Sequence, residues 1–205
     1  MEIRACKRLA FKIIILTFAI LGIVLTSLFT NEKIPENGEF QKIEIPSNIE
    51  TGDIVFRLGT GFWSPFFGSM NTVSGFSHVG VAIINEDGDV KVLHAESEDF
   101  SNKGGIQLTS IKLFKKESKA FSIKKNNMPL ETKSKFVEIL LNMKNQNVSF
   151  DDDFTLEDYG QRVYCTEYLW IAARKAGEMK LGVKSLYAGR TIISVDSIFQ
   201  SEILE

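Results

Sequence analysis

The sequence predicts an α+β domain in which an antiparallel sheet is packed by helices. Between residues 52 and 124, short segments rich in β-branched residues alternate with turns that contain Gly and Asp, as is typical of strands with short connections. From residue 131 onward, apolar residues recur at the helical spacing i, i+3, i+4 and i+7. Strands that come first and helices that come late favour this fold class over a regular alternation of the two.

The strands are expected early in the chain, and each follows from a local pattern. Gly52 and Asp53 form a turn that launches the first strand, and residues 85–89 form a hairpin turn between two β-branched segments. The expected elements are a strand at 52–57, a loop rich in Gly, Ser and aromatic residues at 58–77, paired strands at 78–84 and 90–95, and short strands at 106–108 and 120–124.

Two helices are expected later. The first, from Glu131, carries an apolar stripe that includes Phe136 and Leu140, and an acidic, aromatic stretch at 150–154 follows it. The second spans residues 165–176, has no internal breaker and ends at Gly177.

The first thirty residues are predicted to be a membrane anchor. Basic residues precede an uncharged run of 18 residues from 13 to 30, which is the lower limit for a spanning helix. This charge distribution puts the N-terminus in the cytoplasm and the remaining chain outside. A cleaved signal peptide is the main alternative, although no small-x-small site closes the run, and a buried core helix is the third interpretation. Residues 31–50 are expected to be a tether and residues 51–205 the domain.

The charge balance gives no reason to expect a nucleic-acid partner. The net charge is −2 and the pI is about 5.8, so there is no basic surplus. A content of 44% hydrophobic and 24% charged residues is ordinary for a globular domain, and no cofactor is expected.

The two cysteines are predicted to lie on opposite sides of the membrane, so Cys6 and Cys165 cannot pair. A lone exported thiol is either deeply buried or chemically used. Because Cys165 is placed where a helix begins, we expect the helix dipole and free N–H groups to lower its pKa and favour the thiolate. The same N–H groups are suited to binding the oxyanion of a tetrahedral intermediate.

The chain has two histidines, and both fall on the predicted hairpin. His78 opens the first strand and His94 stands near the end of the second. A symmetric pairing about residue 86 puts them opposite one another, roughly 5 Å apart at Cβ if they share a face. With Cys165 they would supply a nucleophile, a base and a group that orients the base. The alternatives are surface-exposed histidines or a zinc site made by Cys165, His78 and His94 with a carboxylate as fourth ligand, but no CxxC or HxxxH pair supports a metal site.

The aromatic loop before His78 has three interpretations. Its aromatic residues either pack in the core, wall a substrate cleft or contact the bilayer. Trp63, Phe66 and Ser77 are the candidates for substrate binding.

Several segments resemble motifs of the NlpC-type papain-like hydrolases. Residues 51–56 (TGDIVF) and 76–82 (FSHVGVA) resemble the family's GD-[LI]-[VI]-F and SHVGI motifs, and residues 92–95 (VLHA) are similar to its next strand. The cysteine helix follows these strands, as in the circularly permuted, YiiX-like branch. Residues 150–154 (FDDDF) and 164–169 (YCTEYL) resemble the YDxxF and YCSEL pattern of that branch.

The resemblance implies a papain-like fold and acyl transfer through a thioester. It implies Cys165 as nucleophile, His78 as base and His94 as the orienting residue. Permuted relatives often have Glu at the third position, so Glu96, two residues further on the same strand face, is the second candidate for that role. Glu167 and Tyr164 are possible supporting residues, the latter as an oxyanion donor.

Three functions follow as hypotheses. The first is hydrolysis of an amide bond in a peptide of the peptidoglycan type, which the extracytoplasmic placement favours. The second is a lipid-directed acyltransferase or amidase of the lecithin:retinol acyltransferase type, acting on an amide or ester, which the anchor and the aromatic loop favour. The third is a non-catalytic binding module. The joint presence of Cys165, His78 and His94 argues against it, because an inactive relative would be expected to have lost one of them.

Overall fold

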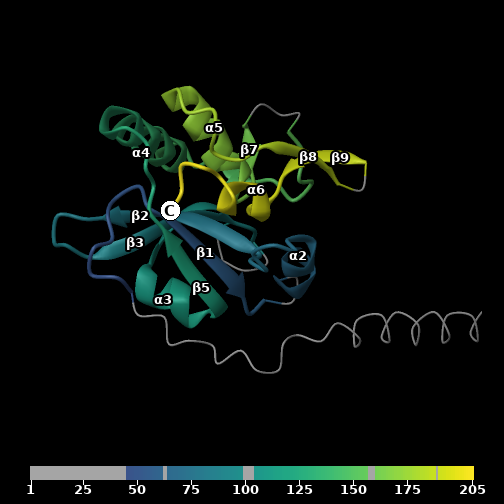
Figure 1. The fold of residues 1–205 in the computed structure, drawn as a ribbon, viewed down its shortest axis with the longest axis horizontal. Coiled ribbons are helices and arrows are strands. Elements are labelled where there is room, and N and C mark those ends of the chain that lie inside the picture. The colour runs from purple at the N-terminus through teal and green to yellow at the C-terminus, as the bar shows by residue number, and fades with distance from the viewer. Residues whose placement is uncertain (1–44, 62–63, 99–103, 157–159, 188) are drawn as a thin grey trace, which may run out of the picture. The chain divides into compact units, whose positions relative to one another are not determined.

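The computed structural model describes residues 45–61, 64–98, 104–156, 160–187 and 189–205. Its compact unit contains a five-stranded antiparallel sheet in the order β4-β3-β2-β1-β5, with helices packed against it, so the predicted α+β class is confirmed (Figure 1). The strands of this sheet are β1 Ile54–Gly59, β2 His78–Ile84, β3 Val90–Glu96, β4 Gly105–Ser110 and β5 Ser118–Lys124.

The helices and two small sheets complete the described fold. The helices are α2 Ser64–Met70, α3 Ile111–Lys116, α4 Leu130–Asn145, α5 Glu167–Ala176 and α6 Val195–Phe199. The small sheets pair β6 Ser149–Phe150 with β7 Arg162–Val163 in parallel, and β8 Lys184–Tyr187 with β9 Arg190–Ile193 antiparallel.

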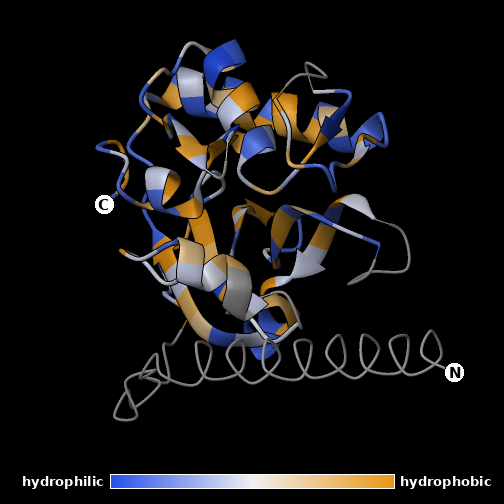
Figure 2. Cartoon of the chain, turned by 90° about the vertical axis from the view of Figure 1, so that its right-hand side faces the viewer, coloured by the Kyte–Doolittle hydropathy of each residue, from blue (hydrophilic) through white to orange (hydrophobic). Residues whose placement is uncertain are grey.

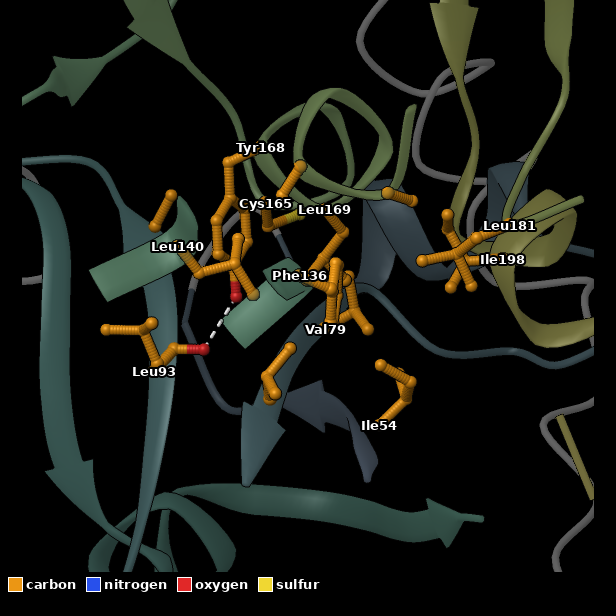
Figure 3. Close-up of a cluster of buried hydrophobic side chains, with 14 of the residues drawn as sticks. Ile54, Val79, Leu93, Phe136, Leu140, Cys165, Tyr168, Leu169, Leu181 and Ile198 are labelled. Carbon is orange, nitrogen blue, oxygen red and sulfur yellow. Dashed lines mark hydrogen bonds between the residues drawn. The ribbon is translucent and has the colours of Figure 1, made fainter. Parts of the chain in front are cut away.

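Two hydrophobic clusters lie on opposite faces of the large sheet, because successive side chains of a strand point to opposite sides. The larger cluster joins Val79, Val81 and Leu93 to residues of α4 and α5. Figure 3 shows Val79 and Leu93 from this cluster together with Phe136, Leu140 and Leu169 of the two helices. We call this the α5 face. The smaller cluster joins Val55, Ala82 and Val92 of the strands to Ile111 and Phe114 of α3 and Phe121 of β5, and we call it the α3 face. Figure 2 shows hydrophobic and hydrophilic residues alternating along the elements that form these layers.

The β2–β3 hairpin has a register that differs from the predicted one. Its turn closes with a 3.1 Å hydrogen bond from Asn85 N–H to the Asp89 carbonyl, and Gly88 adopts a φ of 82°. Val81 pairs with Leu93, which centres the hairpin on residue 87 and not on residue 86. The predicted strand register was therefore wrong: moving the centre by one residue shifts each cross-strand pair by two positions. The cause is that the turn closes between residues 85 and 89. An even shift preserves the faces, so the two histidines still lie on the same side of the sheet.

The ladder between β2 and β3 ends at the Val81–Leu93 pair. The first residues of β2 pair with β1 only, and the last residues of β3 pair with β4 only. At this point the Tyr168 hydroxyl of α5 donates a 2.6 Å hydrogen bond to the Leu93 carbonyl (Figure 3). A helix side chain therefore satisfies a strand carbonyl where the ladder stops.

Other boundaries also differ from those predicted. The loop at 58–77 contains α2, and α3 and α6 were not predicted. Helix α5 begins at Glu167 with Thr166 as its N-cap, two residues after the predicted start, and it ends at Gly177 with a φ of 96°, as predicted. In the segment expected to be a tether, Ile45 and Ile49 pack against the α3-face cluster.

The predicted membrane anchor at 13–30 lies outside the described residues. Within the ranges that the structure describes, no helix is both long and apolar enough to cross a bilayer.

Candidate active site

Cys165 lies directly before the N-cap of α5 and is buried on the α5 face (Figure 3). Its two neighbours in the chain are held by β9. The Thr166 hydroxyl donates a 2.6 Å hydrogen bond to the Ile193 carbonyl, and the Ile193 N–H donates a 2.9 Å hydrogen bond to the Tyr164 hydroxyl. The thiol therefore sits on a segment fixed at both sides.

The Cys165 sulfur is close to the start of β2. The backbone N–H groups of Val79 and of Cys165 itself lie near it, and both favour the thiolate. Burial is the strongest effect, and with Glu96 also raising the pKa and Arg57 lowering it, the pKa of the thiol is raised to about 12. The expectation of a lowered pKa was wrong for this structure, because the helix starts later than predicted and desolvation outweighs its N–H groups.

His78 and His94 contact each other on the α3 face. His78 Nε2 lies 3.0 Å from His94 Nδ1, and His94 Nε2 lies 2.8 Å from the Thr109 hydroxyl. Both rings pack against Phe114, with centroid separations of 5.8 Å and 5.1 Å. Gly80 permits this approach, since a Cβ there would lie 3.1 Å from the His94 Cβ and 2.8 Å from the Leu93 oxygen.

Burial keeps both imidazoles neutral at physiological pH. Burial, with a smaller contribution from the nearby Arg57, lowers the pKa of His94 to about 3. It also lowers the pKa of His78 well below the ordinary value, with smaller contributions from Arg57 and His94. His78 itself remains partly exposed at the first position of β2.

Arg57 and Thr109 complete this group, which we call the histidine cluster: Arg57, His78, His94, Glu96 and Thr109. The Arg57 guanidinium is buried, forms an ion pair with Glu96 and lies 3.3 Å from Glu117. It also stacks 4.3 Å from the centroid of the Phe114 ring. Sequence reasoning missed Arg57, although a charged residue at the end of the predicted first strand was a usable signal.

The structure brings the two histidines together but does not bring them to Cys165. Val79 points to the α5 face with the thiol, whereas His78 points to the α3 face, as strand alternation requires. Both residues are described, and no hydrogen bond joins the Cys165 sulfur to His78. The connection between the two groups is the β2 backbone at Val79 and the electrostatic influence of Arg57 and Glu96 on the thiol.

The supporting candidates have mainly structural contacts. Of the two candidates for orienting His78, His94 is within hydrogen-bond distance of it and Glu96 is not. Glu96 Oε2 instead lies 3.7 Å from His94 Nδ1. Buried Glu167 accepts a 3.4 Å hydrogen bond from the N–H of Tyr164, and the Tyr164 hydroxyl holds β9. Burial raises the pKa of Tyr164.

The predicted substrate-binding residues are only partly described. The Ser77 hydroxyl accepts a 3.1 Å hydrogen bond from the N–H of Gly59, so it ties the loop before His78 to β1. Trp63 and the Phe66 side chain lie outside the described part of the chain.

The sheet, the histidine hairpin and the later cysteine helix together define a YiiX-like α+β fold. A solved structure described as metalloprotein YiiX from Escherichia coli O157:H7 superposes with a TM-score of 0.63. That match covers 76% of this chain and 94% of the E. coli chain at 18% sequence identity, so it shows the fold alone. Neither the protein-family models nor the curated protein sequences give a match. The predicted resemblance to the YiiX-like branch is thereby confirmed at the level of fold.

Proposed function

We propose that this protein is a thiol-dependent hydrolase that cleaves an amide bond through a thioester on Cys165. The observation that carries the proposal is the position of the sulfur. It lies ahead of α5 and near the Val79 N–H, and Val79 directly follows His78. The likeness in fold to YiiX supports the same assignment.

In the proposed reaction, His78 accepts the thiol proton as the Cys165 sulfur attacks the carbonyl carbon of the substrate. The S–C bond forms, the carbonyl electrons move to oxygen, and the intermediate collapses when the leaving amine takes the proton from His78. Water then attacks the thioester, releasing the acid and restoring the thiol. His94 orients the base through the 3.0 Å contact between the two rings in the resting protein.

The imidazole of His78 must leave His94 and turn to the sulfur for this step. His78 is the first residue of β2, is partly exposed and is not paired with β3. These features favour a change of its side-chain conformation. Because the thiol and imidazole are both neutral at rest, the base acts during attack and no preformed ion pair is required.

The proposed substrate is an amide in a peptide of the peptidoglycan type, and the proposed location is outside the cytoplasm on a membrane anchor. A lipid-like amide or ester is the alternative substrate, which would make the protein an acyltransferase or amidase.

A second candidate function is metal-dependent chemistry. The E. coli protein of similar fold is described as a metalloprotein. In this chain His78, His94 and Glu96 offer ligand atoms that all lie within 4.8 Å of one another. When bound, a metal ion would supply Lewis acidity at this position.

Trapping of the thioester tests the proposed hydrolase. The full-length chain is incubated with p-nitrophenyl acetate, p-nitrophenyl palmitate and a peptide p-nitroanilide, and the adducts are located by peptide mass spectrometry. We expect an acyl group on Cys165 that disappears with time, no adduct or turnover in Cys165→Ala, and unchanged turnover in Cys6→Ser. Turnover that persists in Cys165→Ala would refute the thioester route and favour the metal-dependent alternative. The preference between the acetate, palmitate and peptide substrates distinguishes the proposed acyl groups.

A further inference from the structure

We propose that His78, His94 and Glu96 bind one divalent transition-metal ion, with Zn²⁺ as the best-matched species. This inference deepens the metal-dependent candidate function above and uses His78 and His94, which the proposed hydrolase also uses. It can be tested apart from that hydrolase, because the cluster contains no thiol and lies on the sheet face opposite Cys165.

The three donor atoms converge on one point. His78 Nε2 and His94 Nδ1 are 3.0 Å apart, and Glu96 Oε2 lies 3.7 Å from the same His94 nitrogen. Tetrahedral Zn²⁺ with bonds of roughly 2.0–2.1 Å separates its nitrogen and oxygen ligands by about 3.3 Å. The two separations from His94 Nδ1 bracket this value, and all three donor atoms lie within 4.8 Å of one another. Two imidazoles and one carboxylate also leave a coordination position open, and they match Zn²⁺ or Fe²⁺ better than Ca²⁺ or Mg²⁺.

His94 and Glu96 each have a partner that holds the polar atom not assigned to the metal ion. His94 Nε2 contacts the Thr109 hydroxyl at 2.8 Å, which leaves Nδ1 to face His78 and Glu96. Glu96 Oε1 is held by Arg57, which leaves Oε2 on the side of His94. Histidine and carboxylate ligands in metal sites are oriented in this way through their non-ligating atoms.

The charge and protonation of the group suit a cation. One guanidinium, Arg57, stands against two carboxylates, Glu96 and Glu117. With His94 donating from Nε2 to Thr109, its Nδ1 accepts the proton that His78 carries on Nε2. The ion would bind the other tautomer of His78, in which that proton is on Nδ1. The lone pairs of His78 Nε2 and His94 Nδ1 are then both available as ligands, without a change in net protonation. Phe114 covers both rings and limits access of water from that side.

Metal binding by the full-length, tag-free chain tests this site. Zn²⁺ is titrated against a chromophoric chelator, and Co²⁺ is added separately to record its d–d absorption. We expect one equivalent of Zn²⁺ and a four-coordinate Co²⁺ spectrum, both lost in His94→Ala. Glu96→Gln should weaken binding, whereas Glu117→Gln removes the same charge from the same arginine and should leave binding nearly unchanged.

Two further variants keep the test decisive if Glu96→Gln does not fold. Thr109→Val removes only the hydrogen bond to His94 and should weaken Zn²⁺ binding by about 10–100-fold. Cys165→Ser should bind Zn²⁺ as the unmodified chain does. Because this variant cannot form a thioester, its Zn²⁺ binding tests the metal site separately from the proposed hydrolase. Absence of a one-equivalent site in the unmodified chain, loss of binding in Cys165→Ser, or equal effects of Glu96→Gln and Glu117→Gln would overturn the proposal.

Discussion

The two faces of the central sheet carry different chemistry although the same strands form both. The α5 face is an apolar core in which Cys165 and the Tyr168 hydroxyl are buried among Val, Leu and Phe side chains. The α3 face has a smaller apolar cluster, beside which the buried Arg57 and His94 both contact the half-buried Glu96. Strand alternation makes this division at Val79 and His78, so residues adjacent in sequence enter separate environments.

Burial drives the reactive groups of both faces toward their neutral forms. It raises the pKa of the Cys165 thiol and lowers the pKa of each imidazole, so neither the thiol nor the imidazoles are charged at neutral pH. Arg57 and Glu96 remain as a compensated ion pair. The comparison therefore shows that one face holds a protonated thiol and the other a pair of neutral imidazoles.

The largest effect on stability is expected from Arg57→Met. This change leaves the Glu96 carboxylate buried without its partner, and removing one member of a buried pair costs about 3–5 kcal/mol. Urea unfolding of the full-length chain measures the loss. Lys180→Met, which breaks an exposed ion pair with Glu202, is the control and should cost about 0–1 kcal/mol. Equal losses in the two variants would show that the α3 face does not depend on its buried charge.

A smaller effect is expected from Tyr168→Phe on the α5 face. The variant keeps the ring but leaves the buried Leu93 carbonyl without the hydroxyl that satisfies it, at a cost of about 1–3 kcal/mol. The exposed Tyr187 provides the matched control, and Tyr187→Phe should change the unfolding free energy by less than about 0.5 kcal/mol. A silent Tyr168→Phe variant would mean that the end of the β2–β3 ladder does not need this hydrogen bond.

The most gradual effect is the dependence of stability on pH. His94 has a pKa of about 3 in the folded protein and an ordinary value of 6.5, so between these values the unfolded chain binds the extra proton. Its contribution is complete above about pH 6.5 and is lost as the pH falls toward 3, by up to about 1.4 kcal/mol per pH unit.

Unfolding measured from pH 7 to pH 4 with a chelator present should show this decline, and the slope should be reduced in His94→Gln. A slope identical in the two proteins would assign the decline to other groups.

The sequence predicted the elements with strong periodicity and the residues with distinctive chemistry. The strand at 78–84 is confirmed to the residue, and the helix that ends at Gly177 is confirmed at its C-terminal end. The sequence also indicated that His78 and His94 share a face, because that conclusion depends only on the parity of the hairpin register.

The separation of Cys165 from the histidines was beyond local patterns. It depends on which face of β2 the cysteine helix covers, and that follows from tertiary packing of α4 and α5 around Val79 and Val81. Arg57 and Thr109 join the histidine cluster only through pairing of β1 and β4 with their neighbours. The raised pKa of Cys165 likewise results from burial, which a helix-start argument does not measure.

The direct test of the account is the pH dependence of Cys165 alkylation by iodoacetamide, followed by peptide mass spectrometry in the full-length chain and in His78→Ala. If His78 accepts the proton during attack, the rate should be nearly constant between pH 6 and 9, because the imidazole remains neutral throughout this range. In His78→Ala only the rare thiolate reacts, so the rate should be lower at pH 7 and should rise about tenfold per pH unit. A tenfold rise per pH unit in both proteins, with equal rates at pH 7, would contradict the account and leave Cys165 as a buried structural residue.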